Sequence, residues 1–370
     1  RSWKPLTAAS ASEKRGMSVK ATKINTHGLE KCYAVATLRY KGRDHLLVAA
    51  EKQNKCLLFD LDGHLEDTVW EGPGGTMTMV QVPGSDGVFL ATHEFYSPND
   101  SKRARIVLSA PKAEGGWEVR TLVSLPFVHR FDILTAGDRH YLIACTLKSG
   151  HEYKDDWSVP GKIWAAELPE DLSEVDEEHP LPLICIKDGL LKNHGYCRIC
   201  DEDGEWALVS ADNGIFRVVP PALAGGRWRV ELLTAEAASD AVYVDFDGDG
   251  EKELLAITPF HGDTVKIYKN RGGGCRPVYT CAAPLEFAHG IWGGTALGLP
   301  LAFIGHRKGN RDLLAFYYDT KAGMYTSQVL DHDVGPANVL CYEMDGQCRL
   351  VAANRETDEI AFYQIENNGN

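Results

Sequence analysis

The chain has 370 residues, of which 44% are hydrophobic, and it carries a formal net charge of −13 at pH 7. The excess of acidic residues argues against non-specific binding to nucleic acid, which needs clustered lysine and arginine. No apolar stretch reaches the roughly 20 residues that a membrane-spanning helix requires. We therefore expect neither a nucleic-acid partner nor a membrane partner.

The first part of the chain, residues 1–16, is polar and has no signal-like apolar run. We interpret it as a flexible leader before a single domain over residues 17–370. The ten cysteines are scattered, most of them inside apolar runs, which is typical of buried thiols rather than of a disulfide framework. This usage favours a cytoplasmic protein. If the leader instead follows a removed signal, the protein is secreted.

An apolar pattern then recurs seven times, at spacings of about 40 to 65 residues. Each repeat reads as short strands rich in Val, Ile, Leu, Phe and Tyr, which we name A to D in chain order, bounded by Gly, Asp and Asn turns. The equivalent B strands are 46–52, 88–94, 141–147, 206–212, 253–259, 300–306 and 349–355. Repeats of this length made only of strands predict an all-β, seven-bladed propeller of four-stranded antiparallel blades.

Two segments need separate interpretation. The last repeat ends without a strand D of its own, and residues 19–25 can supply one. Such pairing of the two ends of the chain closes the ring and removes free sheet edges. The acidic stretch over 169–179 is expected to be a solvated loop.

One loop predicts a cation site. Asp245, Asp247, Asp249 and Glu253 alternate along a glycine-containing turn, so their hard oxygen atoms can converge on one ion. We expect a structural calcium ion there. This loop resembles the loops of the FG-GAP/VCBS propeller repeats.

Histidines concentrate at one end of the predicted channel. Aligning the starts of the A strands gives a ring of Lys31, Thr76, His129, His194, Asp240, His289 and Ala337. Aligning the ends of the B strands gives Glu51, His93, Thr146, Ala211, Thr258, His306 and Asn354. In a propeller both sets are expected to open beside the channel on the same face.

Neutral imidazole is the commonest protein ligand of divalent transition metals. His129, His194 and His289 therefore predict an open three-histidine site for zinc, manganese, iron or nickel. His261 lies close by, in the loop after the B strand of the fifth repeat.

Further rim residues are candidates for catalysis. His93 and His306 are expected to act as acid and base, or to ligate instead, and Tyr96 and Tyr153 can donate protons. Arg307 and Arg355 can hold a carboxylate or phosphate by two contacts.

The propeller with a histidine-lined rim is similar in architecture to the propeller of fungal aldos-2-ulose dehydratase and to the propeller polysaccharide lyases. The resemblance implies an enzyme in which His, Tyr, Arg and a bound metal remove a proton beside a carbonyl and expel an oxygen. We therefore expect a lyase, dehydratase or isomerase that acts on a sugar or sugar acid. Two alternatives stay open: a non-catalytic module that binds a protein or glycan, and a metal-dependent, lactonase-like hydrolase.

Overall fold

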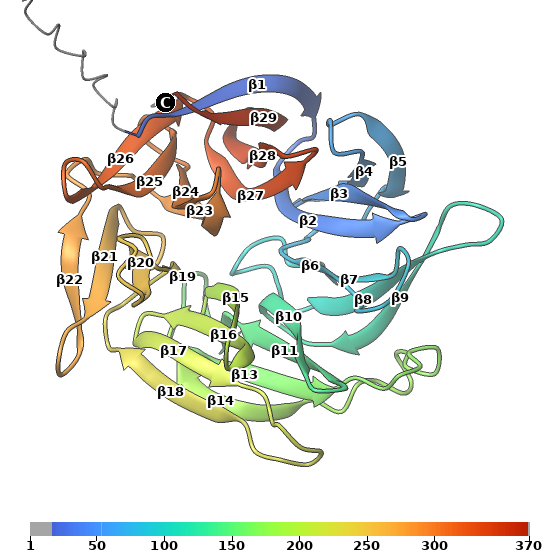
Figure 1. Ribbon diagram of the computed structural model, residues 1–370. Helices are drawn as coiled ribbons and strands as arrows, with labels where there is room; N and C mark the ends of the chain where they lie inside the picture. Colours follow the sequence, from blue (N-terminus) through green and yellow to red (C-terminus); the bar gives the residue numbers. More distant parts are fainter. Residues whose placement is uncertain (1–16, 53, 369–370) are drawn as a thin grey trace, which may run out of the picture.

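The computed structural model describes residues 17–52 and 54–368, and it consists of seven sheets arranged in a ring (Figure 1). The predicted leader, 1–16, lies outside the described residues. Within the described residues the single helical element is the 3₁₀ turn η1, Arg355–Thr357. None of the helices found in this part of the chain is long and apolar enough to cross a membrane.

The predicted seven-bladed propeller is confirmed, and each blade is an antiparallel sheet whose first strand lies innermost (Figure 1). Blades 1 to 3 contain β2 (Cys32–Tyr40), β3 (Arg43–Ala50), β4 (Cys56–Phe59) and β5 (Leu65–Trp70); β6 (Met79–Gln81), β7 (Phe89–His93), β8 (Arg105–Pro111) and β9 (Trp117–Ser124); β10 (Val128–Ala136), β11 (Arg139–Thr146), β13 (Val159–Glu167) and β14 (Ile184–Leu190), with the short β12 (Lys148–Gly150) beside β13. Blades 4 to 6 contain β15 (Gly195–Asp201), β16 (Gly204–Ala211), β17 (Gly214–Val219) and β18 (Arg229–Thr234); β19 (Asp240–Val244), β20 (Glu253–Thr258), β21 (Thr264–Asn270) and β22 (Cys275–Thr280); β23 (Ala288–Ala296), β24 (Leu299–His306), β25 (Leu313–Asp319) and β26 (Met324–Asp331). Blade 7 contains β27 (Pro336–Met344), β28 (Gln347–Asn354), β29 (Glu359–Asn367) and β1 (Val19–Gly28).

Burial explains which strands are most apolar. The second strands lie between neighbouring blades on both faces, and every residue of β20 is buried. The outermost strands have water on one side, so β5 and β22 are largely exposed or half-buried. A strand buried on both faces reads as a continuous apolar run, which is why the B strands were visible in the sequence.

The ring is closed by the two ends of the described chain. β1 pairs with β29 in antiparallel register from Val19 opposite Asn367 to Gly28 opposite Glu359. The closing strand is thus where the sequence predicted it, although it is longer than 19–25. The acidic stretch 169–179 contains no helix or strand, as expected.

A β-bulge recurs at the inner end of the first strand in four blades. The pairing register of each innermost strand skips one residue there, and the skipped residues are Tyr33, His129, His289 and Ala337. His194 occupies the equivalent place just before β15, with its N–H bonded to Ser210 O at 3.2 Å. In blade 1 the bulge residue is therefore Tyr33 and not Lys31, so the sequence alignment of this strand was wrong by two residues. A bulge re-aims one side chain away from the sheet face.

Candidate metal centre

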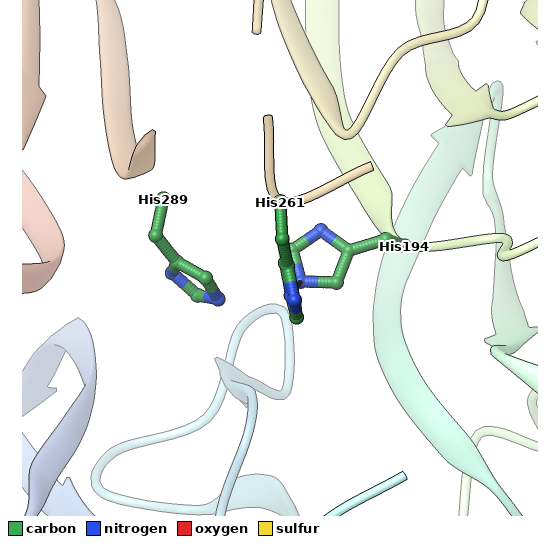
Figure 2. A group of neighbouring side chains, drawn as sticks. All are labelled: His194, His261 and His289. Atoms are coloured by element: carbon green, nitrogen blue, oxygen red, sulfur yellow. Dashed lines mark hydrogen bonds between the residues drawn. The ribbon is translucent and has the colours of Figure 1, made fainter. Parts of the chain in front are cut away.

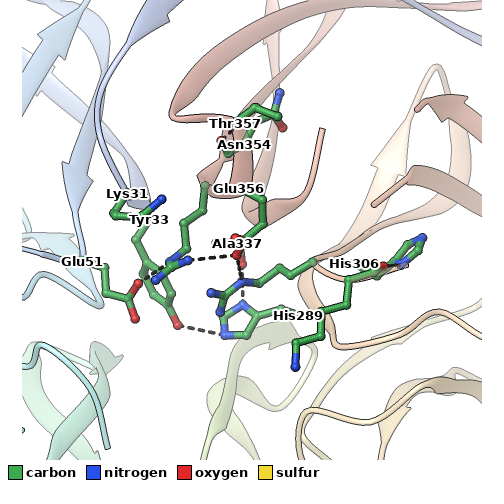
Figure 3. Close-up of polar contacts among 12 residues, drawn as sticks. Lys31, Tyr33, Glu51, His289, His306, Ala337, Asn354, Glu356 and Thr357 are labelled. Atoms are coloured by element: carbon green, nitrogen blue, oxygen red, sulfur yellow. Dashed lines mark hydrogen bonds and ion pairs between the residues drawn. The ribbon is translucent and has the colours of Figure 1, made fainter. Parts of the chain in front are cut away.

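Three of the four bulge residues, Tyr33, His129 and His289, meet in the central channel. The hydroxyl of Tyr33 lies 3.0 Å from Nε2 of His289 and 3.4 Å from Nε2 of His129. These side chains come from blades 1, 6 and 3, which are not neighbours in the ring, so they can meet only across the channel. Figure 3 shows Tyr33 and His289 approaching each other in this way.

Three imidazoles converge in the channel: His194, His261 and His289 (Figure 2). Each offers a ring nitrogen, and these nitrogen atoms all lie within 4.8 Å of one another. The ring centroid of His194 lies 4.9 Å from that of His261 and 5.0 Å from that of His289. His194 and His289 are buried, whereas His261, on the loop between β20 and β21, is half-buried. The cluster therefore has one member near solvent.

Backbone carbonyls of the next blade fix which nitrogen carries the proton. His194 Nδ1 lies 3.0 Å from Ser239 O, and His289 Nδ1 lies 2.6 Å from Ala337 O. A carbonyl oxygen only accepts, so Nδ1 donates and Nε2 keeps its lone pair. Imidazoles that ligate metals are commonly oriented by such a hydrogen bond from the other ring nitrogen.

One nitrogen pair of the cluster has the spacing of zinc ligands, and all three rings have the protonation that a metal ligand needs. A tetrahedral zinc ion with bonds of ~2.0–2.1 Å separates its ligand nitrogens by roughly 3.4 Å. Nε2 of His194 and Nε2 of His261 lie 3.4 Å apart. Burial lowers the pKa of His194 to about 3, and also lowers the pKa values of His261 and His289 well below the ordinary range. The three rings are therefore neutral at pH 7, as ligands must be.

His129, predicted as the third ligand, lies beside the cluster rather than in it. Its ring packs against His194 with centroids 4.4 Å apart, and its Nδ1 lies 3.3 Å from His194 O. Its Nε2 faces the hydroxyl of Tyr33. The structure thus groups His261 with two of the three predicted ligands and gives His129 a phenol as its partner.

The B-strand ends do not join the cluster. His93 packs edge-on against Trp70, with centroids 4.6 Å apart, and His306 Nδ1 lies 2.9 Å from Lys308 O. Both residues end second strands, β7 and β24, whose side chains point to the blade faces and are buried between blades. The expected second ring of channel-facing residues therefore does not form at His93 and His306.

The two predicted tyrosines lie elsewhere as well. Tyr96 is buried, and its hydroxyl donates to Pro73 O at 3.2 Å. Tyr153 lies on the loop after β12 and is 67% exposed. The structure brings neither phenol to the histidine cluster, and Tyr33 is the phenol found there.

The two predicted arginines form an ion-pair network with Glu356, which Figure 3 labels. Arg307 donates from Nε to Glu356 at 2.8 Å, and Arg355 donates from Nη1 to the same carboxylate at 2.9 Å. Arg355 also pairs with Glu51. The guanidinium of Arg307 lies 4.4 Å from the ring of Phe287. Arg307 is therefore the arginine nearer to the aromatic surroundings of the cluster.

The carboxylates of the acidic loop lie close together, as predicted, and a lysine lies among them. Oxygen atoms of Asp245, Asp247, Asp249 and Glu253 all lie within 4.8 Å of one another. Nζ of Lys269 lies 2.7 Å from Asp247, 2.5 Å from Asp249 and 3.0 Å from Glu253. These hydrogen bonds raise the pKa of Lys269 despite its burial. An ammonium group thus lies in the place where we expected calcium.

Two residues of these sites escaped the sequence alignment. Tyr33 was hidden because a bulge has no sequence signature of its own. Lys269 carried only a weak signal: it lies on β21, which also holds Lys266 and which pairs with β20, the strand that begins at Glu253 of the acidic loop. A lysine on the strand beside such a loop can reach the loop's carboxylates.

Comparisons with known proteins bear on the fold. No family model matches the chain, and no curated protein matches it. Among solved structures, the chain is similar to that of a candidate 6-phosphogluconolactonase from Bacteroides uniformis, with a TM-score of 0.53 and 16% sequence identity. The similarity covers 92% of this chain and 96% of the other. At this identity the comparison supports the propeller architecture, and FG-GAP/VCBS membership stays a prediction.

Proposed function

We propose that the protein is an enzyme that acts on a sugar or sugar acid at the histidine cluster, by elimination or isomerisation. The observation that carries the proposal is the convergence of His194, His261 and His289 with nitrogen atoms within 4.8 Å of one another. A divalent transition metal held there would act as a Lewis acid on a substrate carbonyl.

The chain's own groups beside the cluster suit proton transfer. His129 Nε2 and the Tyr33 hydroxyl lie 3.4 Å apart, and burial raises the pKa of Tyr33 to about 12. The phenol therefore holds its proton at pH 7 and can donate it to an oxygen that leaves the substrate. Burial lowers the pKa of His129 well below the ordinary range, so its imidazole is neutral at pH 7 and would accept a proton as a weak base. In this proposal these two residues take the acid–base role first expected of His93 and His306.

A second candidate function is a metal-dependent hydrolase of the lactonase type. A three-histidine site that leaves positions open can also activate water. The similar structure from Bacteroides uniformis is of a candidate 6-phosphogluconolactonase. Product analysis separates the two reactions, because an elimination creates an unsaturated product that absorbs in the near ultraviolet and a lactone hydrolysis does not.

The first experiment is elemental analysis of the purified protein beside a His194→Ala, His289→Ala double variant. We expect near-stoichiometric zinc, manganese, iron or nickel in the wild type and its loss in the variant. A His64→Ala, His179→Ala double variant is the matched control, because both side chains are about 70% exposed and lie outside the cluster. It should keep the metal. Equal metal content in all three proteins, or none after incubation with each metal, would reject the metal-dependent enzyme and favour a non-catalytic binding propeller.

A further inference from the structure

Four cationic side chains act on the histidine cluster, although two of them, Arg307 and Lys192, also pair with carboxylates. Arg130 and Arg307 both act electrostatically on His194 and His289, and Lys192 and Lys308 act with Arg307 on His261. A divalent metal would add further positive charge at the same place. Such a site favours a ligand that brings negative charge.

Arg130 is the cation that lies next in sequence to the histidines of the channel. It follows the bulge residue His129, and its guanidinium donates to Met77 O at 2.8 Å and to Asn338 Oδ1 at 3.2 Å. The guanidinium lies 5.9 Å from the ring of Tyr33. No carboxylate of the described residues forms an ion pair with Arg130, although the charge of Arg130 acts on the buried carboxyl group of Asp240.

Aromatic rings surround the half-buried His261. Phe260 stacks on it with centroids 3.9 Å apart, and Phe287 meets it edge-on at 4.4 Å. Trp157 meets Phe260 edge-on at 5.2 Å. These three aromatic side chains are half-buried, so part of each is open to solvent. Aromatic faces of this kind suit the apolar face of a sugar ring.

The remaining cations lie over those aromatic rings. Nζ of Lys192 is 5.7 Å from the centroid of Trp157 and 5.4 Å from that of Phe260, and it pairs with Asp212 at 3.3 Å. Nζ of Lys308 is 5.5 Å from the centroid of Phe287. Lys308 is exposed and forms no ion pair within the described part of the chain. The structure thus alternates aromatic and cationic groups around His261.

We propose that this surface, which we call the mouth, binds a sugar that carries a carboxylate. Its residues are Trp157, Lys192, Phe260, Phe287, Arg307 and Lys308. The aromatic rings would contact the face of the sugar ring, while the exposed Lys308, together with Lys192, Arg307 and Arg130, would attract the carboxylate. The inference rests on the proposed function, and it narrows the substrate class from sugars in general to sugar acids.

The test is calorimetric titration of the purified, metal-loaded protein with D-glucuronate at pH 7, beside D-glucose as the neutral sugar of the same ring size. We expect glucuronate to bind at least about tenfold more tightly than glucose, with an affinity that falls as salt rises. Lys308→Gln should weaken glucuronate binding about three- to tenfold and leave glucose binding unchanged. Because Lys308 is exposed, this variant should fold.

Two further variants complete the design. Arg130→Gln removes the charge of this guanidinium group and should weaken glucuronate binding by a similar factor. Arg227→Gln is the matched control, because Arg227 is exposed on the loop between β17 and β18, and it should bind like the wild type. Equal affinity for the two sugars, no binding of either, or no effect of Lys308→Gln and Arg130→Gln would overturn the inference.

Failure of this inference is distinguishable from failure of the proposed function. A protein that binds metal through His194 and His289 but does not discriminate glucuronate from glucose would reject only the sugar-acid inference. A protein without metal that still prefers glucuronate would reject only the metal-dependent enzyme.

Discussion

His93 is the residue that best reports how burial couples protonation to stability. It is 5% exposed, and its Nε2 has no hydrogen-bond partner among the described residues. Burial lowers its pKa to about 4, and the charge of Arg105 acts in the same direction. An unfolded histidine has a pKa near 6.5. Between these values the unfolded chain binds a proton that the native chain does not.

This difference predicts acid destabilisation with a defined sign. The free energy of unfolding should fall as pH falls from 6.5 towards 4, and His93→Gln should reduce the loss between pH 7 and pH 4.5 by about 2 kcal/mol. Urea unfolding at the two pH values measures it. His179→Gln, whose side chain is 74% exposed, is the control and should keep the wild-type dependence. A wild-type pH dependence in His93→Gln would contradict the assignment.

Lys269 predicts how the acidic loop responds to calcium. Its ammonium group contacts three carboxylates and is 7% exposed. Lys269→Met should leave these carboxylates uncompensated and lower the free energy of unfolding by about 3 kcal/mol. Millimolar calcium should restore much of this loss in the variant and should stabilise the wild type less. Thermal unfolding with and without calcium measures both effects. If calcium stabilises the wild type as strongly as the variant, the ion displaces the ammonium group, and the prediction of a structural calcium site is correct.

At the scale of single residues, the prediction of channel-facing side chains depended on aligning the first strands of the blades in the correct register. His194 and His289 could be placed at the channel because their strands align without gaps. Tyr33 could not, because the bulge of β2 lies two residues after Lys31, the residue aligned with the histidines. The roles of Tyr33, His129 and His261 depend on contacts between different blades, which no local pattern encodes.

At the scale of elements, the close approach of blades 4 and 5 supports the metal centre. A Cβ added at Gly195 would lie 2.6 Å from both Asp240 Cα and Ser239 O. Ser239 O is the carbonyl that orients His194. These backbone atoms cannot move aside as a flexible side chain would, so the packing here tolerates only glycine.

Gly195→Ala should therefore lower the free energy of unfolding by about 1–3 kcal/mol, the usual cost of overpacking. It should also weaken metal binding, because Ser239 O would shift relative to His194. Gly150→Ala is the matched strand variant, since nothing lies within 4 Å of its added Cβ. Chemical unfolding and metal content check both effects. Equal stability of the two variants would show that blades 4 and 5 separate freely.

The strands themselves were largely predictable. Second strands such as β20 are buried on both faces, so their apolar runs stand out, and the closing strand β1 followed from counting strands in the last repeat. Side-chain direction was less predictable. His93 and His306 end their strands at the expected place, but the alternation of a strand sends them between blades.

At the scale of the whole molecule, stability depends on joining the two ends of the described chain. β1 covers the edge of β29 over the full length of that strand. Val19 at its start is fully buried, in a cluster that includes Leu350 and Tyr363. Without β1, the propeller would present an open sheet edge and an unfilled core position.

Deletion of residues 1–28 should therefore lower the unfolding temperature and cause self-association through β29. Light scattering and thermal unfolding measure the two effects. A synthetic peptide of residues 17–28 should restore the monomer when added back, because an extended segment can complete a sheet edge. A truncated protein that stays monomeric with wild-type stability would show that blade 7 is stable with three strands.

The carbonyl contacts between neighbouring blades have a consequence for how such a protein changes over generations. His129, His194 and His289 are each oriented by a main-chain oxygen of the following blade, from His194, Ser239 and Ala337. Every residue type has that oxygen, so the orienting contact survives replacement of the side chain that supplies it. Each blade can accordingly exchange its channel-facing residue independently of its neighbour. The same propeller can thus acquire a new activity through single substitutions in the channel. Among the bulge residues of the described chain, Ala337 is the one without a functional side-chain group, so a substitution there would introduce such a group at the lowest cost.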